Sequence, residues 1–312
     1  MSRVHHILII DDCHLVLQDT LSAYEVVYMP TITEAELEVE LVKATILIMR
    51  SKLRLTKEWI DRAPILELVG RLGSGMDNID VVYAEQRGIK CLNAPEGNSN
   101  AVAEQTIGMM IGLLANVSRS SRQVRNGVWD RKGNQGKELK NLCVGIIGYG
   151  NVGSALARLL QVFGCKVLAY DKFKVGFGDE YAEEVSLERL KSEADLVSLH
   201  VPLNEFSHEM INQSFISEME KPFYVLNLAR GFVVKISDII SGLKEGKILG
   251  AALDVLPNEN ILNCGDDEQK ELNYLSENED VIVTPHIGGL TEDSYKLLAE
   301  VLAEKINNWI KK

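Results

Sequence analysis

Residues 144–160 read VGIIGYGNVGSALARLL and place three glycines between an apolar run and an amphipathic run. Gly148, Gly150 and Gly153 have the spacing G-x-G-x-x-G, which occurs both in phosphate cradles and in tight turns that bind nothing. In a cradle, Gly148 permits the tight turn, Gly150 lets a pyrophosphate approach the backbone, and Gly153 lets helix and strand pack closely. The elements around the motif decide between the two interpretations.

The segments around the motif favour a bound dinucleotide. The run CVGII precedes the glycines, a helix-like segment follows them, and residues 166–171, KVLAYD, form a second apolar run ending in an acid. Asp171 follows Gly153 at close to the roughly 20-residue spacing of the acid that hydrogen-bonds an adenosine ribose. This carboxylate would repel a 2′-phosphate and so favours NAD, while Lys172 and Lys174 keep NADP as a minor alternative.

Composition limits the class of protein. The chain has 312 residues, 46% of them hydrophobic, enough for two domains of about 100 to 200 residues each. Its formal net charge of -12 argues against a nucleic acid partner. Five scattered cysteines suggest neither a disulfide framework nor a zinc site, and we expect no metal. The N-terminus lacks a signal-peptide pattern and no run approaches about 20 apolar residues, so we expect a cytoplasmic protein without a membrane span.

Short β-branched runs alternate with longer helix-like segments along the chain. This alternation predicts an α/β fold with parallel sheets covered by helices. We expect strands in the first part at 6–11, 24–29, 45–49, 66–72 and 89–93, with helices at 33–44, 56–63 and 78–88. After Lys140 the pattern restarts, with strands at 142–148, 166–171, 196–200, 223–229, 248–255 and 281–286. The sequence therefore predicts two doubly wound parallel-sheet domains.

Three further segments stand out. Residues 98–127 predict one long helix, apolar in its first half, which is either a core helix or part of a dimer interface. Residues 291–312 predict a last helix that returns to the first domain, because no strand follows it. The acidic stretch 262–280 is either a lid or an inert loop, and we favour the inert loop.

Motifs after the glycines carry a resemblance to a known family. NLARG at 227–231, GAALDVLPNE at 250–259 and TPHIGG at 284–289 resemble, in this order, the signature of the D-isomer-specific 2-hydroxyacid dehydrogenases. Segments of the first part, such as VGRLGSGMDNID at 69–80, resemble that family too, so the likeness covers nearly the whole chain. It implies a Rossmann NAD-binding domain at 99–287 and a flavodoxin-like substrate-binding domain at 1–98 plus 288–312.

The resemblance also implies the catalytic residues. His286 would take the hydroxyl proton as general base, Glu259 would hydrogen-bond the imidazole, and Arg230 would hold the substrate's carboxylate and carbonyl oxygens. The chemistry needs such groups: a histidine titrates near neutral pH, a carboxylate stabilises its imidazolium, and an arginine matches a carboxylate bidentately. Each residue taken singly has an ordinary structural explanation, and only the ordered motifs favour catalysis.

The binding residues follow from the same likeness. Cofactor contacts are expected at Ser74, Gly148, Gly150, Asn151, Val152, Gly153, Asp171, Val201, Ala229, Arg230, Asp254, His286 and Gly288. Substrate contacts are expected at Arg50, Arg71, Ser74, Gly75, Arg131, Arg230 and His286, with the loop from Gly73 to Gly75 offering backbone N–H groups to the carboxylate.

Three arginines bear on the choice of substrate. The phosphoglycerate dehydrogenases of the family have arginines in places matching Arg50, Arg71 and Arg131, the last offered by a neighbouring subunit, although Arg131 alone could be an ordinary surface residue. We therefore predict oxidation of 3-phospho-D-glycerate to 3-phosphohydroxypyruvate, the first step of serine biosynthesis. A homodimer is expected from the resemblance and from the apolar helix that begins near Asn98.

Two other functions stay open. One is a glyoxylate or hydroxypyruvate reductase of the same family, and the other is an NAD(H)-sensing corepressor that mainly binds proteins. The chain departs from the family at Asn258 and Asn260, which flank Glu259 where many members read E-E-P, and at Leu290, where a serine is common. We also expect no regulatory domain after Lys312 and hence no serine feedback through one.

Overall fold

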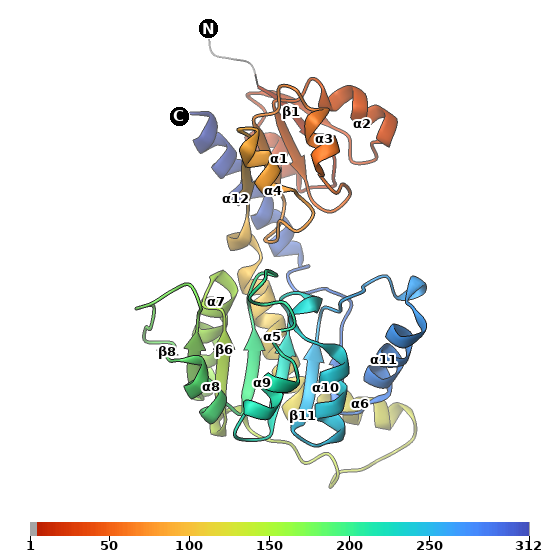
Figure 1. Cartoon of the computed structure of the whole chain (residues 1–312), viewed down its shortest axis with the longest axis vertical. Helices are drawn as coiled ribbons and strands as arrows, with labels where there is room; N and C mark the ends of the chain where they lie inside the picture. Colours follow the sequence, from red (N-terminus) through yellow and green to blue (C-terminus); the bar gives the residue numbers. More distant parts are fainter. Residues whose placement is uncertain (1–4, 312) are drawn as a thin grey trace. The chain divides into compact units, whose positions relative to one another are not determined.

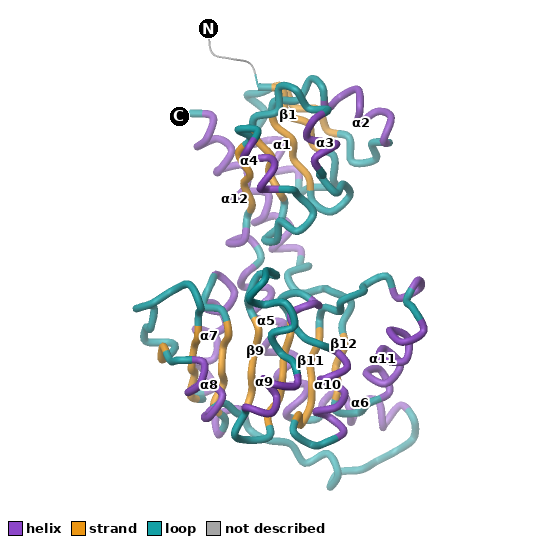
Figure 2. Tube along the Cα trace, in the orientation of Figure 1, coloured by secondary structure: helices purple, strands orange, loops and turns teal. Residues whose placement is uncertain are grey.

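The computed structural model describes residues 5–311, which form two compact units. The first comprises Met1–Ser99 and Gly289–Lys312, and the second comprises Asn100–Gly288. Strands lie side by side in each unit and helices cover both faces of each sheet (Figure 1; Figure 2). The predicted α/β class with two parallel sheets is confirmed.

The first unit has a five-stranded parallel sheet in the order β2-β1-β3-β4-β5. Its central strands are apolar throughout because both faces are covered, and Ile46–Met49 is buried along its whole length. The strands are β1 His6–Ile9, β2 Glu25–Tyr28, β3 Ile46–Met49, β4 Leu68–Arg71 and β5 Lys90–Asn93. The helices are α1 Leu15–Thr20, α2 Glu34–Leu41, α3 Lys57–Asp61, α4 Val81–Gln86, η1 Pro95–Gly97 and α12 Glu292–Ile310.

Helix α12 closes one face of this sheet. Its buried residues Leu298, Leu302 and Ile306 recur every fourth position and share a hydrophobic cluster with Leu17 of α1. A Cβ on Gly97 would lie 2.7 Å from the backbone of Leu298, so η1 and α12 touch backbone to backbone. The last helix of the chain therefore completes the core of the first unit.

The second unit has a seven-stranded parallel sheet in the order β12-β11-β10-β9-β6-β7-β8. Its strands are β6 Cys143–Ile147, β7 Lys166–Tyr170, β8 Glu183–Glu184, β9 Leu196–Leu199, β10 Phe223–Asn227, β11 Ile248–Leu253 and β12 Val281–Val283. Its helices are α5 Ser99–Leu114, α6 Val117–Arg125, η2 Leu139–Asn141, α7 Asn151–Leu160, η3 Gln161–Phe163, α8 Leu187–Glu193, α9 Gln213–Glu218, η4 Gly231–Val233, α10 Ile236–Lys244, η5 Ile261–Asn263 and α11 Asp266–Glu277. Strand β6 pairs with both β7 and β9, which is the point where the strand order reverses. Ligands of such sheets bind outside the carboxyl ends of the strands at this point.

Two expectations about helices were wrong. Residues 98–127 form two helices, because Asn116 adopts a left-handed conformation with φ of 53° between α5 and α6. The acidic stretch 262–280 is not a loop, since most of it is the helix α11. Only Leu275 of α11 is buried, so the stretch lacked the apolar periodicity by which a helix is predicted.

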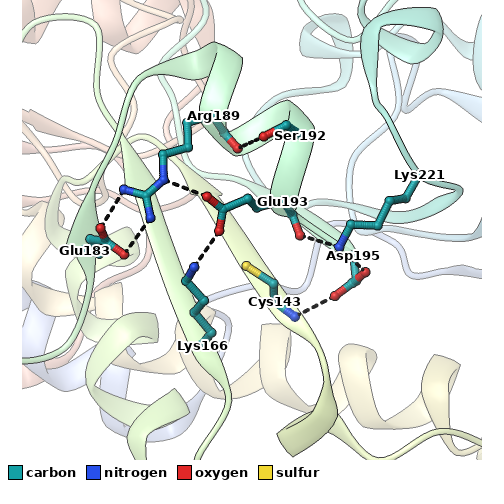
Figure 3. A network of polar contacts seen from close by, with 8 residues as sticks. All are labelled: Cys143, Lys166, Glu183, Arg189, Ser192, Glu193, Asp195 and Lys221. Atoms are coloured by element: carbon teal, nitrogen blue, oxygen red, sulfur yellow. Dashed lines mark hydrogen bonds and ion pairs between the residues drawn. The ribbon is translucent and has the colours of Figure 1, made fainter.

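A polar network holds the amino ends of the strands (Figure 3). Glu193 of α8 accepts from Arg189 at 2.7 Å and pairs with Lys166 at the start of β7. Asp195, just before β9, accepts from the backbone N–H of Cys143 in β6 at 2.8 Å. The glycine motif follows the opposite end of β6, so this network serves the packing of the sheet.

Candidate active site

Two of the three motif glycines lie in close contact with other backbone atoms, and the third faces open space. A Cβ on Gly148, whose φ is 95°, would lie 2.4 Å from the carbonyl oxygen of His200, and one on Gly153 would lie 2.1 Å from that of Gly148. Gly148 therefore permits close backbone contact between the ends of β6 and β9, and Gly153 lets the first turn of α7 pack on the glycine loop. A Cβ on Gly150 would meet nothing within 4 Å, and Gly150 caps α7 without a side-chain hydrogen bond. The amino end of α7 thus faces open space with unpaired N–H groups.

Asp171 is tied to the glycine loop at the end of β7. Its carboxylate accepts from the backbone N–H of Tyr149 and from that of Phe173, both at 2.9 Å. Lys174 donates to the carbonyl oxygen of Tyr149 at 2.7 Å. The acid and the loop are therefore held as one unit, and the ammonium group of Lys174 lies beside them.

A pocket of about 260 Å³ opens between the ends of β6, β7 and β9. Gly148, Gly150 and Asp171 line it together with apolar side chains, among them Val201, Pro202, Phe206 and Met210. The aromatic rings of Phe173 and Phe206 pack edge to face, with 5.7 Å between their centroids. An open helix terminus, a carboxylate and apolar walls suit the phosphates, ribose and base of a dinucleotide. Phe173 and Phe206 are not among the site residues expected from the sequence, because no motif marks these apolar positions.

His200 stays neutral beside this pocket. Its Nε2 lies 2.8 Å from the hydroxyl of Ser198, and desolvation by burial lowers its pKa to about 4. His200 and the next residue, Val201, both line the pocket. Asn151 and Val152 form the first turn of α7 directly after Gly150.

His286 and Glu259 meet after β12 and β11. Nδ1 of His286 lies 2.8 and 2.9 Å from the two carboxylate oxygens of Glu259. The backbone of His286 is left-handed, with φ of 52°, and its N–H donates to the carbonyl oxygen of Asp254 at 2.8 Å. Both side chains are nearly half exposed, 45% for His286 and 48% for Glu259, so a small molecule can reach them. The pair can accept a proton at Nε2 while the carboxylate holds the other ring nitrogen.

Asp254 holds the segment that carries His286. Asp254 is 1% exposed, and its carboxylate accepts from the backbone N–H groups of Ile287, at 3.0 Å, and Gly288, at 2.7 Å. Gln105 and Thr284 donate to the same carboxylate at 2.8 and 2.5 Å. These contacts fix the loop after β12. Neither Gln105 nor Thr284 is among the site residues expected from the sequence, although Thr284 opens the TPHIGG motif.

Arg230 follows β10 next to the segment that leads to Glu259. Its guanidinium donates to the carbonyl oxygen of Ala229 at 2.7 Å, and Asn227 donates to the carbonyl oxygen of Arg230 at 2.9 Å. A Cβ on Gly231 would lie 2.0 Å from the backbone of Leu256. The chain after Arg230 therefore packs directly on the chain before Glu259.

In the first unit, the expected anion-binding residues share one sheet edge. Arg50 follows β3, Arg71 ends β4, and the two strands are neighbours. Asp11 fixes the backbone of Arg50 by accepting from its N–H at 2.7 Å, while the guanidinium of Arg71 lies across Gly73.

The adjoining loop is held by side chains. Ser74 donates from its hydroxyl to Asn98 at 2.5 Å, and its carbonyl oxygen accepts from Asn93 at 2.6 Å. Gly75 follows in the same loop. Arg131 is exposed and belongs to the second unit, in the segment between α6 and β6, so the structure does not group it with Arg50 and Arg71 within one unit.

Within residues 5–311, no cluster of three or more histidines, cysteines or acidic residues could hold a metal ion. None of the helices in that range is long and apolar enough to cross a membrane.

Comparisons with known proteins agree with this geometry. Residues 107–288 match the family model described as D-isomer specific 2-hydroxyacid dehydrogenase, NAD binding domain. A D-3-phosphoglycerate dehydrogenase of Methanocaldococcus jannaschii is 34% identical over 281 residues, which cover 88% of this chain and 51% of that protein. A hydroxypyruvate reductase of Thermotoga maritima is 35% identical over 261 residues, covering 84% of this chain and 83% of that protein.

One solved structure has a similar fold over nearly the whole length of this chain. The D-lactate dehydrogenase of Aquifex aeolicus, complexed with NAD and lactic acid, has a TM-score of 0.84 and 29% identity, and covers 98% of this chain and 96% of that one.

The rat D-3-phosphoglycerate dehydrogenase is 32% identical over 96% of this chain but 54% of its own length. The chain thus spans about half the length of the two phosphoglycerate dehydrogenases named here.

Proposed function

Because the chain belongs to the D-isomer specific 2-hydroxyacid dehydrogenase family, we propose that it oxidises a D-2-hydroxy acid with NAD, and that the acid is 3-phospho-D-glycerate. The second unit is the NAD-binding domain of this family. The observation that carries the proposed reaction is the contact between His286 and Glu259 at 2.8 Å, which equips an exposed imidazole to accept a proton.

The roles of the residues follow from their chemistry. Bound NAD supplies the acceptor for the hydride that leaves the carbon bearing the hydroxyl group. Nε2 of His286 takes the hydroxyl proton, and Glu259 stabilises the imidazolium and fixes the tautomer that leaves Nε2 free to accept. Arg230 offers a planar cation to the carboxylate and to the forming carbonyl oxygen. Each role serves the same step, since the hydride leaves only as the proton is removed.

The choice of a phosphorylated acid rests on Arg50 and Arg71. Two guanidinium groups at neighbouring strand ends of an acidic protein supply more positive charge than one carboxylate needs. The relatedness to phosphoglycerate dehydrogenases supports the same choice.

The test is a substrate panel with matched variants. We expect NADH formation with 3-phospho-D-glycerate to exceed that with D-glycerate, D-lactate and D-2-hydroxyglutarate. Arg50→Ala and Arg71→Ala should each raise KM for the phosphorylated acid by about 10- to 100-fold, since a hydrogen bond to a charged group contributes about 1.5–3 kcal/mol. Arg62→Ala removes an exposed cation of the same unit that pairs with Glu38, and should leave KM unchanged. An unchanged KM in both test variants would overturn the phosphate assignment.

A second candidate is reduction of hydroxypyruvate or glyoxylate. The relative from Thermotoga maritima named as a hydroxypyruvate reductase, of which 83% is matched, favours it. Faster turnover of unphosphorylated keto acids than of 3-phosphohydroxypyruvate would establish this candidate. Binding of NADH without turnover of any acid on the panel would favour a dinucleotide-sensing protein instead.

We also propose that two copies of the chain associate. Val124, Val128 and Trp129 are exposed on α6 and the segment after it, with Trp129 78% exposed, and such apolar side chains favour a protein interface. Sedimentation should give the mass of a dimer for the wild type and a larger monomer fraction for Trp129→Ala.

A further inference from the structure

The acid that contacts His286 lies on an irregular segment of the chain. Glu259 stands between β11 and η5, where neither helix nor strand hydrogen bonds fix the backbone. Its side chain is 48% exposed, so packing holds it weakly. A carboxylate in this setting needs some other constraint to stay within 2.8 Å of His286.

The residue before Glu259 provides such a constraint. The side-chain oxygen of Asn258 accepts from the backbone N–H of Asn260 at 3.0 Å, so the side chain spans the peptide of Glu259. Its Nδ2 donates to a carboxylate oxygen of Glu268 at 2.9 Å. Asn258 therefore forms a local turn and ties it to a second element.

Glu268 is a firm anchor for this turn. It lies in the first turn of α11, and the oxygen that accepts from Asn258 also accepts from the backbone N–H of Gly265 at 3.0 Å. The hydrogen bond from Asn258 is the main cause that lowers the pKa of Glu268, so the carboxylate is charged at neutral pH and both contacts are charge-assisted. Leu275, 1% exposed, anchors α11 in the core of the second unit.

From these contacts we propose that Glu268, acting through Asn258, is a positioning residue that holds Glu259 against His286. The inference rests on the proposed dehydrogenase reaction. It gives a role to the acidic stretch 262–280 and to the N-E-N sequence of residues 258–260.

The first test removes each partner of the contact between Asn258 and Glu268. Glu268→Ala and Asn258→Ala should each lower kcat for the preferred acid by about 10-fold, because small displacements of a catalytic group cost up to about 100-fold. KM for NAD should change less than about 2-fold, because neither residue lines the cofactor pocket. Glu268→Gln keeps an acceptor oxygen for Asn258, so it should retain most of the wild-type kcat that Glu268→Ala loses.

The control is Asp267→Ala. Asp267 precedes Glu268 in the same helical turn, is almost fully exposed, and pairs with Lys270. Removing it takes the same charge from the amino end of α11 but leaves the contact to Asn258, so kcat should stay unchanged. Equal kcat values for Glu268→Ala and Asp267→Ala would overturn the inference.

A double-mutant cycle separates positioning from general destabilisation. If Glu268 acts through Glu259, adding Glu268→Ala to Glu259→Gln should lower kcat no further. A full additional 10-fold loss in that background would contradict the inference.

A measurement without turnover decides the inference even where no acid is oxidised. The imidazole ¹⁵N chemical shifts of His286, which report its hydrogen bond to Glu259, should change in Glu268→Ala and Asn258→Ala but not in Asp267→Ala. Unchanged shifts in the first two variants would overturn the inference. Failure of the wild type on the substrate panel, with the shift changes present, would instead reject the proposed dehydrogenase function.

Discussion

His286 combines a proton-accepting ring with a backbone conformation that few side chains adopt. Its φ of 52° lies in the left-handed region, where asparagine is tolerated and β-branched residues are strained. We predict that His286→Asn lowers kcat by at least about 100-fold, since general base catalysis contributes about 10²–10⁴-fold, while the melting temperature stays close to that of the wild type. Steady-state NADH formation and a thermal melt test this. Retained activity in His286→Asn would reject the general-base role.

Asp171 carries both a structural and a recognition task. Its oxygens hold the backbone N–H groups of Tyr149 and Phe173, and its charge opposes a 2′-phosphate. Asp171→Asn keeps one acceptor oxygen but removes the charge, so the ratio of kcat/KM for NAD over NADP should fall by about 10-fold or more. The matched control is Asp179→Asn, which removes a nearby acid that accepts from the hydroxyl of Tyr149. An unchanged ratio in Asp171→Asn would show that this acid does not select the cofactor.

At the scale of elements, α12 is the helix whose packing completes the first unit. Leu302 is fully buried, and the site of a Cβ on Gly70 of β4 lies 3.3 Å from its side chain. Leu302→Ala should destabilise the first unit by about 2–5 kcal/mol through lost burial and a cavity. Leu297 on the same helix is 43% exposed, so Leu297→Ala should cost less than about 1 kcal/mol. Hydrogen exchange of the β4 and β5 amides measures both effects, and equal protection in the two variants would contradict the prediction.

At the scale of the whole molecule, neutral His200 limits stability in acid. Burial lowers its folded pKa to about 4, against about 6.5 in an unfolded chain. Between about pH 6.5 and pH 4 the unfolded state binds more protons than the folded state. The contribution of His200 to the free energy of unfolding is therefore fully present above about pH 6.5 and is lost as the pH falls toward 4. On going from pH 7.5 to pH 5, the wild type should lose about 2 kcal/mol more than His200→Asn, which cannot titrate.

Denaturant unfolding of the two proteins at both pH values measures this difference. His208 is exposed and stacks on Phe232, so His208→Asn is the control and should follow the wild type. Identical pH dependence in His200→Asn and the wild type would contradict the assigned pKa.

Regular elements were predictable where a local pattern repeats over several residues. The buried strands β3, β6 and β9 are short apolar runs, and their alternation with amphipathic segments indicated parallel sheets. Features without such a pattern were not predictable: a single left-handed residue, Asn116, divides the helix expected at 98–127, and α11 has too few apolar residues to show helical periodicity. Neither feature is marked by a pattern that repeats over several residues, which is the signal that sequence-based prediction uses.

By itself, the sequence determined the α/β class, the family and its NAD cofactor, because glycine spacing, apolar runs and motif order are local properties of the chain. The tertiary structure decided which groups meet. Glu259 and His286 lie on either side of α11 and β12 in the chain, and Asn258 reaches Glu268 on a helix in a stretch for which an inert loop is expected from the sequence. These contacts follow from the packing of β11, α11 and β12, because side chains distant in sequence meet only after the sheet has brought its strand ends together.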